Sequence, residues 1–329
     1  MFFALTEDQQ EFGAAVRGYL AERFDLAAVR GVVEDTDGDG NPATLWKAAG
    51  EQGWLAVTVP EEFDGLGLGL VEAQVIARAL GAGVAPGPWR GTVLAAEAIR
   101  LAGSDEQKAA WLPRLAAAEA VGALASSDAL AAVEYGAIAD VVVTPGGRLV
   151  TGASSTPRGS YDGTVRLADL TGGEVQELAG PVEAEIRARA AVLAAADLVG
   201  VAREALTRTV AYDRERRQFG VPVGSFQAIK HALADLHCTV TMAEHAVLYA
   251  AHAVEVGVED AELAVAVAKA KAGDAAVAST AAMIQYHGGI GYTWEHEAHL
   301  FYKRAKRLAG QWGDAGTHRA RIAELTIAE

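Results

Sequence analysis

Residues 216–227 read RRQFGVPVGSFQ and decide how the last part of the chain is organised. Two arginines stand where a helical pattern ends, a turn with an aromatic residue and a glycine follows, and Ser225 can cap a new helix from about Phe226. Paired arginines before a glycine turn can hold a pyrophosphate through charge-assisted hydrogen bonds. A solvated, charged helix end is the alternative interpretation, and this stretch alone does not choose between them.

A second stretch, QYHGGIGYT at residues 285–293, closes a long helical pattern with a glycine-rich turn. Glycines let a ligand approach the backbone closely and leave amide donors open. A glycine turn after a helix is also an ordinary helix C-cap, so this stretch by itself is a weak indication of a ligand site.

Hydrophobic periodicity divides the chain into three regions. Residues 1–120 predict an N-terminal helical domain, residues 121–182 a small β domain, and residues 183–329 a bundle of four long helices. The predicted fold class is therefore mainly α with a small, shortened β domain.

Local signals add detail to these regions. Thr6 and Gln9 predict a capping box at the start of the first helix. Val141–Val143 and Leu149–Val150 predict a hairpin across a proline–glycine turn, and Val165–Leu167 predicts another short strand.

Composition excludes several function classes. The formal net charge of −15 disfavours nucleic acid as the main partner. The single cysteine, Cys238, lies in an apolar helical pattern and is expected to be buried, and no Cys/His group has metal-ligand spacing. A signal-peptide pattern and a run of about 18 apolar residues are both absent, which predicts a cytoplasmic protein without a membrane span.

In this order and spacing, the two stretches resemble signatures of the acyl-CoA dehydrogenase family. R-R-Q-F-G…F-Q is similar to the family's R-x-x-F-G…F-Q, and Q-Y-H-G-G-I-G-Y-T is similar to its Q-x-x-G-G-x-G-Y. LWKAAGEQGWLAVTVPEEFDGLGL and GSDEQKAAWLP resemble further family segments in the first region. The resemblance covers essentially the whole chain and implies the same three-domain fold.

The resemblance also implies a chemistry. Family members bind FAD, oxidise the Cα–Cβ bond of an acyl-CoA with a glutamate as base, and pass electrons to an electron-transfer flavoprotein. The two signatures reach across a subunit boundary to the adenine and pyrophosphate end of a neighbour's flavin. By matched position, the cofactor-binding residues expected here are Arg216, Phe219, Gln227, Gln285, Gly288 and Gly289.

The catalytic glutamate is the first departure from the family pattern. Matching the family's base segment puts Trp312 or Ala315 at that position, and an earlier alternative position falls near Ala190. Asp314 is the one carboxylate in reach, and a carboxylate buried beside a flavin can act as a base. A surface or helix-capping role is the alternative interpretation for this aspartate.

The middle region is the second departure, because residues 123–129 lack the family's usual motif, no tryptophan motif follows, and the domain is short. We therefore expect a heteromeric enzyme, in which a paralogous partner holds most of the FAD and the catalytic glutamate. This chain is similar to the non-catalytic type of chain in α2β2 steroid side-chain dehydrogenases. The alternatives are a stand-alone dehydrogenase that uses Asp314 and a non-enzymatic acyl-CoA-binding or scaffold protein.

Overall fold

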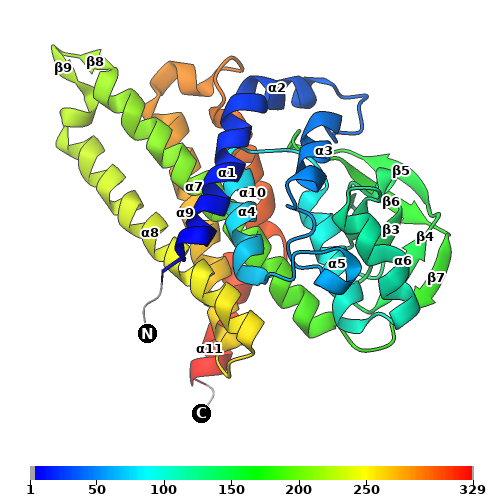
Figure 1. Ribbon diagram of the computed structural model, residues 1–329. Helices are drawn as coiled ribbons and strands as arrows, with labels where there is room; N and C mark the ends of the chain where they lie inside the picture. The colour runs from blue at the N-terminus through cyan, green and yellow to red at the C-terminus, as the bar shows by residue number, and fades with distance from the viewer. Residues whose placement is uncertain (1–3, 328–329) are drawn as a thin grey trace. The chain divides into compact units, whose positions relative to one another are not determined.

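The computed structural model describes residues 4–327, which fold into two compact units. The first unit contains the chain up to Leu26, Gln74–Ala85 and everything from Ala191 onward. The second unit contains Ala27–Ala73 and Pro86–Ala190. Each unit is therefore assembled from segments that are far apart in the sequence (Figure 1).

The first unit is built from helices. Three helices contribute residues to both units: α4 (Leu70–Ala82), α7 (Glu183–Glu215) and α2 (Leu26–Glu34), of which only Leu26 belongs to the first unit. The other helices of the first unit are α1 (Glu7–Arg23), α8 (Gln227–Val256), α9 (Ala261–Tyr286), α10 (Ala298–Gly310) and α11 (Ala315–Ile327). Short elements join them: β8 (Arg217–Gln218), β9 (Val221–Pro222), η3 (Val223–Ser225) and η4 (Gly288–Tyr292).

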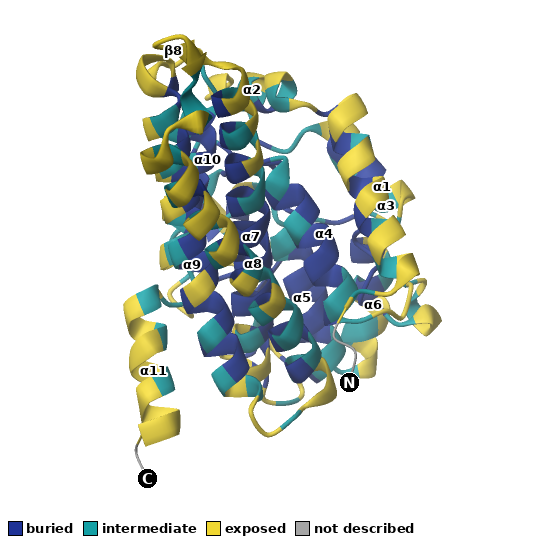
Figure 2. Cartoon of the chain, turned by 90° about the vertical axis from the view of Figure 1, so that its left-hand side faces the viewer, coloured by how far each residue is buried: buried dark blue, intermediate teal, exposed yellow. Residues whose placement is uncertain are grey.

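Small residues set the packing of this unit. A Cβ on Gly81 of α4 would lie 2.2 Å from the backbone oxygen of Asp197, and one on Gly200 of α7 would lie 2.0 Å from that of Arg78. Only glycine permits so close a crossing of two backbones. Buried alanines dominate the inward side of α9, and Figure 2 shows the buried positions of the long helices in the interior of the cartoon.

A buried ion pair joins distant parts of the first unit. Arg304 of α10 donates from Nη2 to Asp197 at 2.7 Å and from Nε at 3.0 Å. Nη1 of Arg304 also donates to the backbone oxygen of Ala85 at 2.9 Å. The charge of Arg304 is balanced by Asp197, and its donors have acceptors in α7 and after α4. This buried pair therefore fixes α10, α7 and the segment after α4 relative to one another.

The second unit combines helices with two small sheets. Its helices are α2 (Leu26–Glu34), α3 (Ala43–Glu51), η1 (Glu61–Phe63), α5 (Trp89–Ala102), α6 (Asp105–Ala116) and η2 (Gly136–Ile138). Its strands are β1 (Gly122–Leu124), β2 (Val133–Glu134), β3 (Val141–Val143), β4 (Arg148–Thr151), β5 (Ser154–Arg158), β6 (Leu167–Thr171) and β7 (Glu174–Glu177). One sheet has the order β1-β3-β4-β7 and the other β2-β6-β5, and β1 with β3 is the parallel pair.

The predicted fold class is confirmed, since helices precede and follow a short set of strands. The capping box at Thr6 and Gln9 is present, and the predicted hairpin is β3 with β4. The strand expected at residues 165–167 instead runs from Leu167 to Thr171 as β6. Within the described residues, no helix is long and apolar enough to cross a membrane.

Two local predictions are wrong. Cys238 is exposed, because the buried positions of α8 include Leu233 and Val240 and leave the cysteine on the opposite side. Ser225 does not cap α8: its hydroxyl donates to the oxygen of Pro222 at 2.6 Å within η3, and Phe226 occupies the N-cap position. The Ser225 hydroxyl is therefore engaged in the tight turn that precedes α8.

Candidate functional site

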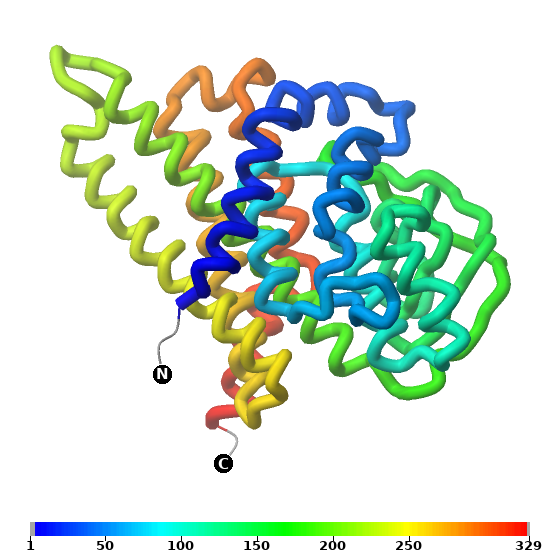
Figure 3. The backbone as a smooth tube through the Cα atoms, in the orientation of Figure 1, coloured from blue at the N-terminus to red at the C-terminus, as the bar shows by residue number. Residues whose placement is uncertain are grey.

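The stretch RRQFG forms a hairpin between the two longest helices. The amide of Arg216 donates to the oxygen of Tyr212 at 2.8 Å, and its own oxygen accepts from Val223 at 2.8 Å, which closes the base of β8 and β9. Phe219 and Gly220 turn the chain with φ of 53° and 82°. Figure 3 follows this turn from α7 into α8, and the Phe219 side chain at its tip is 92% exposed.

The glycine-rich stretch forms a turn at the end of α9. Gly288 has a φ of 64°, and a Cβ on it or on Gly289 would meet nothing within 4 Å, so their backbone faces open space. A Cβ on Gly291, in contrast, would lie 2.6 Å from the oxygen of Ile284. The first two glycines therefore keep the turn accessible, while the third lets it fold back on α9.

Tyr212 and His287 join the two segments. Their rings stack at 4.3 Å between centroids, and the Tyr212 hydroxyl lies 3.4 Å from the backbone oxygen of His287. Nδ1 of the buried His287 lies 2.7 Å from the oxygen of Met283, and burial lowers the pKa of this imidazole. The hairpin base and the glycine turn thus meet at the same end of the first unit. Neither ring could be assigned to this contact from the sequence, because the two residues are 75 positions apart.

The polar residues expected at the cofactor are unpaired. The side chains of Arg216, Gln227 and Gln285 are exposed and make no hydrogen bond or ion pair with other described residues. Unpaired guanidinium and amide groups beside an exposed Phe219 and an open glycine turn fit a diphosphate with an aromatic base. Among the described residues, no hydrogen bond or ring contact joins all six residues expected at the cofactor into one group.

Large apolar side chains are exposed on the same two segments. They are Phe219, Val221 and Phe226 on the hairpin side and Ile290, Tyr292 and Trp294 after α9. Such exposure is uncommon on a surface that has no partner, and it marks interaction sites when the residues gather near polar recognition groups.

A buried carboxylate lies beneath the hairpin. Asp213, in the last turn of α7, is 1% exposed, and neither of its carboxylate oxygens has a hydrogen-bond partner within residues 4–327. Burial raises the pKa of Asp213 to about 6. A Cβ on Gly224 would lie 3.0 Å from the backbone oxygen of Asp213, so the hairpin packs directly against this turn of α7.

Asp314 caps a helix. Its Oδ1 accepts hydrogen bonds from the amide and hydroxyl of Thr317 at 2.7 and 2.8 Å, in the first turn of α11. These bonds lower the pKa of the exposed Asp314 carboxylate, whereas a base requires a raised one. The residues that the resemblance matches to the family's base positions, Trp312 or Ala315 and Ala190, have side chains that cannot accept a proton.

Comparison with known proteins identifies the class. Residues 6–119 match the model for the acyl-CoA dehydrogenase N-terminal domain, and residues 187–326 match that for the acyl-CoA dehydrogenase C-terminal domain. The chain is 37% identical to the acyl-CoA dehydrogenase IpdE2 of Mycobacterium tuberculosis over 303 residues, 91% of each protein. The chain therefore belongs to the acyl-CoA dehydrogenase family.

Solved structures agree with this assignment. The ChsE4-ChsE5 complex of Mycobacterium tuberculosis matches with a TM-score of 0.90 and 26% identity over 99% of each chain. A variant of the Tcur3481-Tcur3483 steroid ACAD matches with a TM-score of 0.89 and 26% identity over 98% of each chain. Solved structures with this fold include one in complex with FADH2. Membership in the acyl-CoA dehydrogenase family supports FAD as the cofactor of this chain. Within the described residues, no group of acidic, histidine or cysteine side chains is placed to hold a metal ion.

Proposed function

We propose that this chain is one subunit of a heteromeric, FAD-dependent acyl-CoA dehydrogenase. It supplies the nucleotide-side contacts to a flavin that is held mainly by a paralogous subunit, and the paralogue carries the catalytic glutamate. The substrate is a CoA thioester with a steroid-derived acyl group, and an electron-transfer flavoprotein receives the electrons.

The unpaired polar groups beside the hairpin and the glycine turn carry this proposal. Arg216 would bind the diphosphate, while Gln227 and Gln285 would hydrogen-bond the adenosine half. Gly288 and Gly289 offer open backbone, and Phe219 offers a ring for the adenine to lie against. Groups that face outward and lack partners in their own chain suit a ligand seated in a neighbour.

The chain's own acidic groups support the division of labour. When bound, the flavin supplies the hydride acceptor for α,β-dehydrogenation, and that reaction also needs a carboxylate for the α-proton. Asp314 is engaged as a helix cap with a lowered pKa, and both other base positions are non-acidic. These observations favour a base from a partner subunit over a stand-alone dehydrogenase that uses Asp314.

The relatives favour a steroid substrate and a second chain. The names ChsE4-ChsE5 and Tcur3481-Tcur3483 each join two proteins, and the second is described as a steroid ACAD. The exposed aromatic residues of the two segments suit burial against such a partner. A purely structural scaffold would not need exposed, unpaired arginine and glutamine side chains around an open glycine turn.

Expression with and without the paralogous neighbour tests the proposal. Alone, the chain should hold little flavin and show no acyl-CoA oxidation, whereas the co-purified complex should be yellow and active. Full flavin content and turnover by the chain alone would refute a divided site.

A residue-level test uses the complex. Arg216→Gln should weaken FAD binding about 10-fold, because a charge-assisted bond is lost. Arg214→Gln, an exposed arginine in the last turn of α7, is the matched control and should retain flavin. Equal flavin loss in both variants would assign the effect to general charge and not to the hairpin.

A further inference from the structure

The ring stack of Tyr212 and His287 lies between two groups that are expected at the flavin. On one side, the backbone oxygen of Tyr212 accepts from the amide of Arg216 at 2.8 Å, so Tyr212 is joined directly to the first residue of the hairpin. On the other side, His287 is the C-cap of α9 and is followed at once by Gly288. The two rings therefore link the arginine to the glycine turn.

Three contacts hold His287 in one orientation. Its ring stacks on Tyr212 at 4.3 Å between centroids, with an interplanar angle of 23°, and the Tyr212 hydroxyl donates to its backbone oxygen at 3.4 Å. Its Nδ1 lies 2.7 Å from the oxygen of Met283. Because a carbonyl oxygen only accepts, Nδ1 carries the proton, and Nε2 has the lone pair in the neutral ring.

The glycine turn folds back on this side chain. A Cβ on Gly291 of η4 would lie 2.9 Å from the Cβ of His287 and 2.6 Å from the oxygen of Ile284. Glycine is therefore required for so close an approach. A displacement of His287 would move η4, and with it Gly288 and Gly289.

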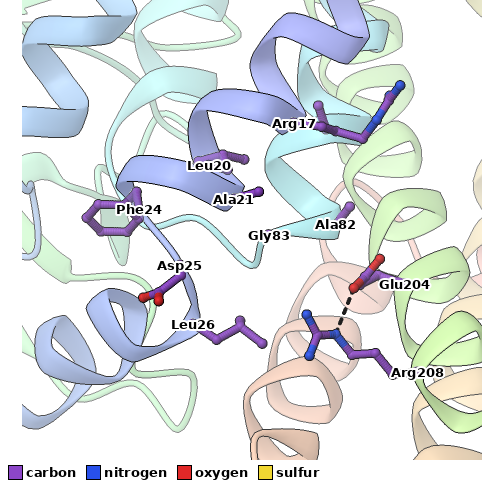
Figure 4. A pocket seen from close by; sticks show the side chains of 11 residues that line it. Arg17, Leu20, Ala21, Phe24, Asp25, Leu26, Ala82, Gly83, Glu204 and Arg208 are labelled. Atoms are coloured by element: carbon purple, nitrogen blue, oxygen red, sulfur yellow. Dashed lines mark hydrogen bonds and ion pairs between the residues drawn. The ribbon is translucent and has the colours of Figure 1, made fainter. Parts of the chain in front are cut away.

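Groups from two elements face His287. Tyr212 comes from α7, and the ring of His296, in the segment before α10, lies 4.5 Å from that of His287. Glu297 adjoins His296 and accepts from Nη1 of Arg208 at 2.8 Å. Nε of the same arginine donates to Glu204 at 2.7 Å, and Figure 4 shows this ion pair in the wall of a pocket of about 360 Å³.

These surroundings favour the neutral ring. Burial lowers the pKa of His287, and the charge of His296 acts in the same direction, whereas the hydrogen bond to Met283 and the charge of Glu297 oppose the shift without reversing it. The stacked ring therefore binds a proton less tightly than a ring in water, whose pKa is about 6.5. The stack is thus fully present above about pH 6.5 and weakens as pH falls below it.

We propose that Tyr212 and His287 are positioning residues for the flavin nucleotide. The pair holds Arg216 and the open backbone of Gly288 and Gly289 at one separation, so that both sides meet the same bound dinucleotide. It acts through these groups and not by a contact of its own. This role rests on the proposed function, since it assumes that these groups contact the flavin.

Hydrogen–deuterium exchange of the full-length chain alone tests the coupling without any flavin. The reporters are the amides of Val223 in the hairpin and Thr293 after the glycine turn, each hydrogen-bonded within its own segment. His287→Asn loses the stacking ring, and Tyr212→Leu removes its partner, so each variant should raise exchange at both amides about 5-fold. His245→Asn, at an exposed position of α8, is the control and should change neither. A rise confined to the mutated segment would overturn the coupling.

The pH dependence of the Kd for FAD, measured on the complex, is a readout that a purely structural role would not change. For the unaltered complex, the Kd should rise as pH falls below about 6.5. His287→Phe keeps a ring for the stack but has neither the Nδ1 donor nor a titrating group. It should bind FAD about 5-fold more weakly at pH 7.5, with a flatter pH dependence. The same pH dependence in this variant as in the unaltered complex would overturn the inference.

The two measurements also separate this role from the proposed function. Full flavin content of the chain alone would refute the divided site, whatever the exchange data give. With flavin bound only in the complex, unchanged exchange and unchanged Kd in His287→Asn and Tyr212→Leu would refute the positioning role alone.

Discussion

The buried carboxylate of Asp213 makes a quantitative prediction about stability. Burial raises its pKa to about 6 in the folded chain, against about 3.9 in an unfolded one. The folded state therefore binds this proton more tightly, and the stability linked to it is fully present below about pH 4 and lost as pH rises through about 6. A difference of roughly two pKa units corresponds to about 3 kcal/mol.

Asp213→Asn isolates this effect, because it keeps the shape of the side chain and removes its charge. Relative to the unaltered chain, the free energy of unfolding of the variant should rise by about 3 kcal/mol between about pH 4 and pH 8. Urea denaturation followed by circular dichroism, at one protein concentration, measures this difference. Asp235→Asn, at an exposed position of α8, is the control and should follow the unaltered chain at every pH. Parallel curves for Asp213→Asn and the unaltered chain would refute the account of an unpartnered, buried carboxylate.

Three further predictions concern single residues. Asp314→Asn should leave turnover of the complex unchanged. It should lower the melting temperature, because a helix cap contributes about 1 kcal/mol to stability. Loss of turnover would instead identify Asp314 as the base. Glu97→Gln should cost about 3 kcal/mol in urea denaturation, because it removes the charge of a buried carboxylate that accepts hydrogen bonds from Arg189 and Arg100, each at 2.7 Å. A change below about 1 kcal/mol would contradict this. Gly81→Ala should strongly destabilise the chain in thermal denaturation, because the new Cβ would meet the backbone of Asp197. Gly18→Ala is the control: its Cβ meets nothing within 4 Å, so it should stabilise α1 by about 0.5–1 kcal/mol. Similar effects of the two variants would refute the close crossing of α4 and α7.

Local signals in the sequence predicted local structure well. The capping box at Thr6 needs only three successive residues after it, and the β3–β4 hairpin needs only two valine-rich runs around a proline–glycine turn. The glycine turn at residues 288–291 was also predicted from its glycines. The positive φ of Gly288 is a conformation that glycine adopts readily. Hydrophobic periodicity does not predict which side of a helix is buried when several sides are apolar. In α8, Val240 is buried and Cys238 is exposed on the opposite side, and the pattern alone did not separate these two positions.

The sequence by itself determined the family and the succession of a helical region, a short region of strands and a second helical region, because these depend on short motifs and on residue types. The residues expected at the flavin stay a prediction from those motifs. Tertiary structure decided the rest. It brought Tyr212 onto His287 across 75 residues, so that the hairpin and the glycine turn share one end of the first unit. It also left Asp213 buried without a partner and held Asp314 as a helix cap. Burial and hydrogen-bond partners depend on which segments pack together, and no short stretch of sequence contains that information.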